Sequence, residues 1–158
     1  MAERPSRAVC LDTSVWVKLW LPEPFSDLVY DLFSSLLDQD WTLIGPPTLP
    51  YEVASVLRGK VRSRVLSEAG AQETWAAFRR YPLTIDTAVD LPDRTWAVAT
   101  RLQLPTAYDA AFLAAAGSRP FVTADRVLLD ACRGDRDVHV VDLTVAQSTL
   151  LGDRPPQQ

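Results

Sequence analysis

Four acidic residues stand out by their positions in the sequence. Asp12 ends a short apolar run, Asp125 follows another, and Glu52 and Asp109 lie near the starts of two expected helices. In an open α/β sheet, ligands bind at the carboxyl ends of the strands, so Asp12 and Asp125 are expected at a site there. Glu52 and Asp109 must then come from helices whose N-termini face the same edge. The chemistry available at this edge is that of carboxylate groups.

Other common catalytic machinery is excluded by composition. The chain has one histidine, His139, placed within an expected strand, so a Ser-His-Asp or Cys-His mechanism would depend on one sheet-bound imidazole. Its six glycines form neither a GxGxxG dinucleotide motif nor a P-loop. One histidine and two widely separated cysteines do not provide the ligands or the spacing of a zinc site.

A purely structural interpretation exists for each of the four acids. A carboxylate near a helix N-terminus is favoured by capping and by the helix dipole. Asp12 or Asp125 could be an N-cap, and Asp109 could form a capping box with Thr106. The four residues are therefore judged as a set.

The elements that must position these acids alternate between strands and helices. The short, apolar strands favour an α/β fold, a three-layer α/β/α sandwich with a central, mostly parallel sheet of four to five strands. On the longest apolar helix, Leu28, Leu32, Phe33, Leu36 and Leu37 are expected on one face. The expected strands are 8–13, 42–44, 83–86, 120–124 and 138–142, and the expected helices are 15–20, 26–39, 51–65, 67–80, 92–102, 107–117, 125–133 and a short C-terminal one.

Composition indicates one domain, residues 1–150, followed by a polar tail, residues 151–158. Of the 158 residues, 47% are hydrophobic, enough for a substantial core. No apolar run approaches the roughly 20 residues of a membrane span, and the N-terminus lacks the apolar region of a signal peptide, so a cytoplasmic protein is expected. Cys10 and Cys132 are expected to be buried free thiols. The net charge of −4 argues against binding nucleic acid by bulk electrostatics alone.

Taken together, the acids and their surroundings resemble the PIN-domain family, specifically the VapC-type toxins of type II toxin-antitoxin systems. The resemblance covers the chain from Ala8 to about Val141. It rests on four segments in the family's order: LDTSVWVKLWLPEP, LPYEVASVLRGKVRSRVLSEAGA, LPTAYDAAFLAAA and FVTADRVLL.

The resemblance implies a role for each matched residue. Asp12, Glu52, Asp109 and Asp125 would be the catalytic, metal-binding acids. Ser14 and Thr123 would be the hydroxyl residues that orient them. Where many relatives carry a further acid or amide after the fourth acid, this chain continues with Arg-Val-Leu, so the choice between one and two metal ions stays open.

The implied activity is metal-dependent hydrolysis of RNA that leaves a 5′-phosphate. Clustered carboxylates raise one another's pKa until a cation arrives, and all-oxygen ligands select Mg²⁺ or Mn²⁺. Such ions can activate water for in-line attack on phosphorus. An alternative is a catalytically inert PIN scaffold that binds RNA or a partner protein. A phosphoacceptor receiver domain ranks lower, because its pocket normally draws an acidic pair from just after the first strand and here Asp12 stands alone.

Two surface features bear on partners. Arg58, Lys60, Arg62 and Arg64 form i,i+4 pairs on one helix, an RNA-backbone track or a docking site for an acidic segment, although a solvated helix face also explains them. Apolar residues concentrate around the first helix, and most of this surface is expected in the core. The family resemblance also implies a partly exposed groove there for a VapB-like antitoxin, as well as pairing of the toxin into a homodimer. These apolar residues are Trp16, Leu19, Trp20, Leu21 and Phe25.

Overall fold

The computed structural model describes residues 7–152 of the chain. Most of the predicted polar tail therefore lies outside the described residues; its first residue, Leu151, ends the last helix. The elements in chain order are β1 (Ala8–Leu11), α1 (Thr13–Lys18), α2 (Ser26–Asp38), β2 (Thr42–Gly45), α3 (Leu49–Arg62), α4 (Glu68–Arg80), β3 (Thr84–Ile85), α5 (Leu91–Arg101), α6 (Ala107–Ala116), β4 (Pro120–Thr123), α7 (Arg126–Ala131), β5 (His139–Asp142), a 3₁₀ turn η1 (Leu143–Val145) and α8 (Ala146–Leu151).

The centre of the molecule is a five-stranded sheet in the order β3-β2-β1-β4-β5, and every strand pair is parallel. All four residues of β1 are buried, as expected for a central strand covered on both faces. The predicted α/β fold with a parallel sheet is confirmed. Because the strands are parallel, their carboxyl ends share one edge, and the residues that follow β1 and β4 are neighbours there.

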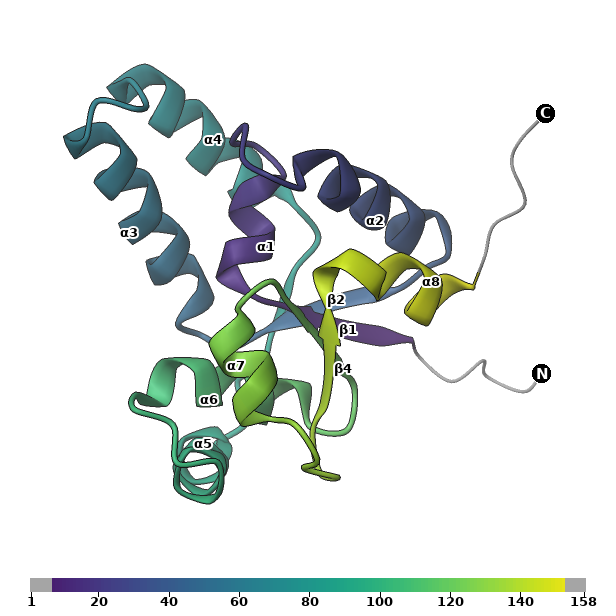
Figure 1. The fold of residues 1–158 in the computed structure, drawn as a ribbon. Helices are drawn as coiled ribbons and strands as arrows, with labels where there is room; N and C mark the ends of the chain where they lie inside the picture. Colours follow the sequence, from purple (N-terminus) through teal and green to yellow (C-terminus); the bar gives the residue numbers. More distant parts are fainter. Residues whose placement is uncertain (1–6, 153–158) are drawn as a thin grey trace.

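Helices cover both faces of this sheet (Figure 1). On one side lie α1, α2 and α8, with α2 packed against α8. On the other lie α5, α6 and α7, and α6 contacts β1, β2 and β4 directly. Seven consecutive residues of α6, 110–116, are buried because the helix is enclosed between the sheet and α5. The helices α3 and α4 form a pair that extends away from the sheet.

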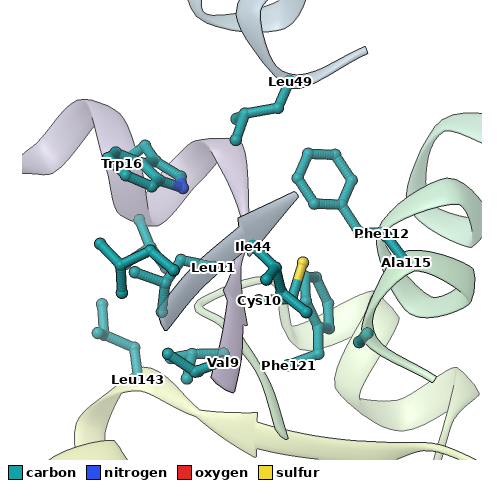
Figure 2. Packing of buried hydrophobic residues seen from close by; sticks show 14 of the residues in the cluster. Val9, Cys10, Leu11, Trp16, Ile44, Leu49, Phe112, Ala115, Phe121 and Leu143 are labelled. Atoms are coloured by element: carbon teal, nitrogen blue, oxygen red, sulfur yellow. The ribbon is translucent and has the colours of Figure 1, made fainter. Parts of the chain in front are cut away.

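The core is continuous across the sheet. Figure 2 shows Val9 and Leu11 of β1 among the packed side chains, with Phe112 of α6 near Phe121 of β4. The centroids of these two rings are 5.9 Å apart. Both cysteines are free and buried, as the sequence predicted.

The prediction that Trp16 contacts RNA or an antitoxin is wrong. The side chain is completely buried, and its ring packs edge-on against Phe33 of α2 and against Phe78 and Tyr81 from α4 and its end. Because α1 is wedged between α2 and the α3/α4 pair, Trp16 has become part of the core (Figure 2).

The predicted apolar face of α2 is displaced by one residue. Leu28 is 42% exposed, whereas the neighbouring Val29 is fully buried beside Leu32, Phe33 and Leu36. The apolar periodicity identified the helix correctly, but it did not decide which of two adjacent apolar residues faces the core.

Helix α3 begins two residues earlier than expected, at Leu49. Pro50 fits its first turn, where the missing N–H has no intrahelical partner to lose. The helix start also packs tightly on the end of β2: a Cβ on Gly45 would lie 2.8 Å from Cδ2 of Leu49. This close approach places Glu52 in the first turn of α3, beside the carboxyl edge of the sheet.

Within residues 7–152, none of the helices is both long and apolar enough to cross a membrane.

Candidate carboxylate site at the carboxyl edge of the sheet

Asp12 is the most buried of the four acids, with 9% of its surface exposed. Its backbone N–H continues the β1/β4 ladder by donating to the carbonyl of Val122 at 2.9 Å. The hydroxyls of Ser14 and Thr123 both donate to its Oδ2, at 3.0 and 2.7 Å. Both residues that the sequence named as orienting hydroxyls therefore contact Asp12.

Burial raises the pKa of the Asp12 carboxyl above its ordinary value. The hydroxyls of Thr123 and Ser14 act in the opposite direction because they stabilise the charged form, and the nearby charge of Asp125 raises the pKa further. Desolvation is the largest of these effects. The carboxylate is thus held in place by two hydrogen bonds while its charge remains unfavourable.

Asp125 is connected to Asp12 through one hydroxyl group. Its backbone N–H donates to Thr123 Oγ1 at 3.0 Å, and the same hydroxyl donates to Asp12. Its side chain caps α7, because Oδ1 accepts the N–H groups of Val127 and Leu128 at 2.8 and 3.3 Å. The capping interpretation is therefore correct for Asp125. Asp12, which also precedes a helix, makes no such side-chain cap.

Glu52 reaches the same edge from α3. Thr13, the residue after Asp12, donates its hydroxyl to Glu52 Oε2 at 2.9 Å. The other oxygen, Oε1, is buried and accepts no hydrogen bond of good geometry from any described residue. Burial raises the pKa of Glu52, the hydroxyls of Thr13 and Thr48 lower it, and the charges of Asp12 and Asp109 raise it. Thr13 was missing from the predicted site, although its place directly after Asp12 was a signal.

Asp109 is the third residue of α6 and is half-buried. Burial raises its pKa, and the charges of Asp12 and Asp125 add to this effect. Thr106 stands at the N-cap position of α6 but makes no side-chain cap, so the alternative capping box with Asp109 is not formed.

The structure thus brings the four acids within electrostatic range of one another. None of them forms an ion pair with a lysine or arginine among residues 7–152. Among the described residues, no three His, Cys, Asp or Glu side chains lie close enough together in this conformation to coordinate one metal ion. The result is a cluster of interacting negative charges without a compensating cation.

Two tyrosines beside these acids were not in the predicted site. Tyr51 and Tyr108 are 77% and 63% exposed, and together with Thr48, Glu52 and Ser55 they line one open hollow. Each tyrosine directly precedes an acid, in the Tyr-Glu and Tyr-Asp pairs of the sequence. The sequence shows each tyrosine next to an acid, but it does not show that the tyrosine side chains are exposed beside the site.

The remaining predicted contact residues differ in their surroundings. Arg58 is paired with Glu68 at 2.7 Å and Lys60 with Glu23 at 2.8 Å, whereas Arg62 is exposed at the end of α3. Trp20 is half-buried and its ring packs edge-on against Phe78 and Tyr81.

A scan against protein-family models finds no match to the sequence, and a search of the curated proteins finds no similar one. Several solved structures are similar in fold, among them the following two. One is a chain of VapBC2 from Rickettsia felis, crystallised with a DNA fragment from their promoter, with 15% identity, a TM-score of 0.64, and 85% of this chain and 98% of that one covered.

The other is PAE2754 from Pyrobaculum aerophilum, with 21% identity, a TM-score of 0.66, and 93% of this chain and 97% of that one covered. Both alignments span most of the sheet and its helices rather than a local motif. The chain therefore has a PIN-like fold, as its sequence predicted.

Proposed function

We propose that this protein is a divalent-metal-dependent endoribonuclease that hydrolyses RNA phosphodiester bonds. The observation that carries the proposal is the uncompensated acid cluster at the carboxyl edge, where ligands bind in open α/β sheets. Burying carboxylates without a cation is costly, so a fold that retains several of them at one edge requires a use for their charge.

The donor set fits Mg²⁺ or Mn²⁺. Asp12, Glu52, Asp109 and Asp125 offer only oxygen atoms, which hard divalent cations prefer. Glu52 Oε1 is buried and accepts no hydrogen bond of good geometry, and the Thr48 hydroxyl that lowers the pKa of Glu52 is the group a cation would have to replace there. When bound, the metal ion would activate a water molecule and stabilise the leaving oxygen at phosphorus.

The protein's own groups have distinct tasks in this proposal. The Ser14 and Thr123 hydroxyls fix the carboxylate of Asp12, and Thr13 fixes that of Glu52. The backbone N–H to Thr123 fixes the main chain at Asp125. Asp109 makes no cap and can turn toward a cation.

We further propose that the chain is the toxin of a toxin-antitoxin pair, acts in the cytoplasm and forms a homodimer. The similar VapBC2 from Rickettsia felis was crystallised bound to a DNA fragment from their promoter. By analogy, a VapB-like antitoxin is the proposed protein partner, and RNA is the proposed substrate.

The decisive test is Asp12→Asn, which keeps an oxygen acceptor for the two hydroxyls but removes the charge. We expect cleavage of a labelled RNA in Mg²⁺ or Mn²⁺ to fall by about 100-fold or more, since loss of even an outer-shell partner costs about 10–100-fold. EDTA should abolish cleavage by the wild type. Asp27→Asn, at an exposed acid in the first turn of α2, is the matched control and should cleave normally. Full activity of Asp12→Asn would refute the proposal.

The second candidate is an inert PIN scaffold that binds RNA or a partner protein. It is favoured by Asp125, whose Oδ1 already accepts two backbone N–H groups. Calorimetric titration with Mn²⁺ separates the candidates. The nuclease requires site-specific heat that Asp12→Asn abolishes, whereas the scaffold predicts the same weak signal for both proteins.

A further inference from the structure

We propose that Tyr51 and Tyr108 form a platform on which unpaired bases of the RNA stack, with Arg62 holding the strand's phosphate backbone. This inference rests on the proposed function and names the residues that would bind its substrate. It assigns a role to two aromatic side chains whose exposure the fold itself does not require.

The first observation is where the two rings lie. Tyr51 comes from the first turn of α3 and Tyr108 from the first turn of α6, yet both line the hollow that contains Glu52. They are 77% and 63% exposed, although large aromatic side chains usually contribute most of their area to a core. Two exposed rings from separate elements therefore flank one carboxylate of the candidate site.

The second observation is that the hollow continues along α3. Tyr51 and Ser55 also line the adjoining hollow, together with Ala54, Arg58, Gly59 and Arg62. Tyr51, Ser55, Arg58 and Arg62 are spaced i, i+4, i+7 and i+11, so they share one helix face. The track from Tyr51 to Arg62 is about 16 Å long at 1.5 Å per residue. It runs from aromatic to cationic side chains.

This combination matches the chemistry of a single strand. A base has an apolar face that stacks on an aromatic ring, and its phosphate is an anion that arginine binds. In a duplex the bases are already stacked on each other, so exposed tyrosines gain little from it. Arg58 is engaged with Glu68, which leaves Arg62 as the more available cation of the track.

The test is equilibrium binding of the full chain to a fluorescent single-stranded oligoribonucleotide and to a hairpin of the same composition. Both are measured in EDTA, with a gel to show that the probe stays intact. We expect Tyr51→Ala and Tyr108→Ala each to weaken single-strand binding by about 10-fold, or about 1.4 kcal/mol. Tyr51→Phe and Tyr108→Phe keep the rings and should bind within about twofold of wild type.

Two matched controls come from the chain itself. Tyr30 on α2 is 64% exposed and lines neither hollow, so Tyr30→Ala should bind normally. Arg62→Ala should weaken binding and reduce the salt slope by about 0.7, the value for one phosphate contact on a single strand. Arg80→Ala, at an exposed arginine that ends α4, should change neither quantity.

Three results would overturn the inference. The first is that Tyr51→Ala and Tyr108→Ala bind like Tyr30→Ala. The second is that the hairpin binds as tightly as the single strand and loses as much in these variants. The third is that polyglutamate, added at the same concentration of negative charges as the RNA, displaces the RNA, and that its own binding is weakened in the tyrosine variants. This result would identify an acidic protein segment as the occupant. Because binding is read without cleavage, these results are independent of whether Asp12→Asn abolishes catalysis.

Discussion

Thr123 is the residue on which the candidate site depends most. Its side chain is completely buried, and its hydroxyl both donates to Asp12 and accepts the N–H of Asp125. One side chain on the central part of the sheet thereby fixes two of the four acids. Removing this hydroxyl would leave the N–H of Asp125 without an acceptor and Asp12 Oδ2 with the Ser14 hydroxyl as its one side-chain donor among the described residues.

Thr123→Val, which has nearly the same shape without the hydroxyl, should therefore destabilise the fold. We expect the free energy of unfolding to fall by about 1–3 kcal/mol, the cost of leaving buried polar groups unpaired. Urea denaturation measures this change. Thr123→Ser retains the hydroxyl and is the control. A Thr123→Val protein as stable as the wild type would mean that water replaces the hydroxyl at no cost.

The raised pKa values of the acids predict a pH dependence of stability. The folded protein holds the proton of Asp12 to a higher pH than the unfolded chain, whose carboxyl titrates near 3.8. Stability contributed by the neutral form is therefore complete below this value and is lost as the pH rises through the folded-state pKa.

Asp12→Asn should accordingly be more stable than the wild type at neutral pH in EDTA. We expect a gain of about 1 kcal/mol, or about 2–4 °C in Tm, that disappears below about pH 4. Thermal melts across this range measure the difference, and Asp31→Asn, at an exposed acid in the middle of α2, should show none. Saturating Mn²⁺ should stabilise the wild type more than the variant. A gain that stays constant with pH would contradict the assigned cause.

At the scale of elements, an ion-pair network joins the chain between α1 and α2 to α3. Glu23 accepts from Lys60 of α3 at 2.8 Å and from Lys18 of α1 at 3.1 Å. The hydrogen bond from Lys60 lowers the pKa of Glu23. A second pair, Arg58–Glu68, joins α3 to α4 but is exposed on both sides.

Glu23→Gln should lower the free energy of unfolding by about 1 kcal/mol at neutral pH, since the pairs are only partly exposed. Because the folded-state pKa is lowered, the contribution is present above the ordinary value of 4.5 and is lost as the pH falls through the lowered value. Glu68→Gln is the control and should have no measurable effect. Denaturant melts at two pH values test both, and equal losses in the two variants would refute the distinction.

The alternation of apolar runs with amphipathic segments was enough to predict the five strands and the helices between them. The apolar runs are short and bounded by turn residues, so both their length and their hydrophobic pattern indicate strands. The helix boundaries were less predictable. The helix α3 was expected to begin after Pro50, but a proline in the first turn loses no hydrogen bond.

The sequence also predicted that Asp12 and Asp125 follow strands whose carboxyl ends carry a site, and the family resemblance implied that the hydroxyls of Ser14 and Thr123 orient the acids. The contacts of these hydroxyls with Asp12 are local or follow from strand pairing. The surroundings of Trp16 could not be predicted in this way, because its partners Phe78 and Tyr81 come from residues about sixty positions later. The exposure of Tyr51 and Tyr108 likewise depends on how two distant helices face each other.

At the scale of the whole molecule, one buried cluster includes residues from β1 to α8. No second core separates from it among the described residues. The predicted single domain implies that all elements unfold together. Scanning calorimetry should therefore show one transition, with equal calorimetric and van't Hoff enthalpies. Two resolved transitions, with the α3/α4 pair melting first, would show that this pair is a separate folding unit.

The charge of the molecule is distributed in a way that suits a metal-dependent site. The chain carries a net charge of −4, and the arginine track on α3 lies next to the acid cluster rather than on the far side. The phosphates of an RNA strand would be attracted to the arginines of α3 and repelled by the acid cluster until a cation binds there. Binding and cleavage should therefore respond differently to divalent ions.

The two hydroxyls that meet at Asp12 make the two oxygens of its carboxyl group inequivalent. Thr123 has a single proton and already accepts an N–H, so the proton must point to Oδ2, which also receives the Ser14 proton. Oδ2 already accepts two hydroxyl hydrogen bonds, whereas Oδ1 accepts neither of them. A proton or a cation that binds Asp12 should therefore bind at Oδ1. The orientation of the Thr123 hydroxyl, at the end of the neighbouring strand β4, thus makes the two C–O bonds of the Asp12 carboxylate unequal. Carboxylate stretching bands in isotope-edited infrared spectra would show this difference.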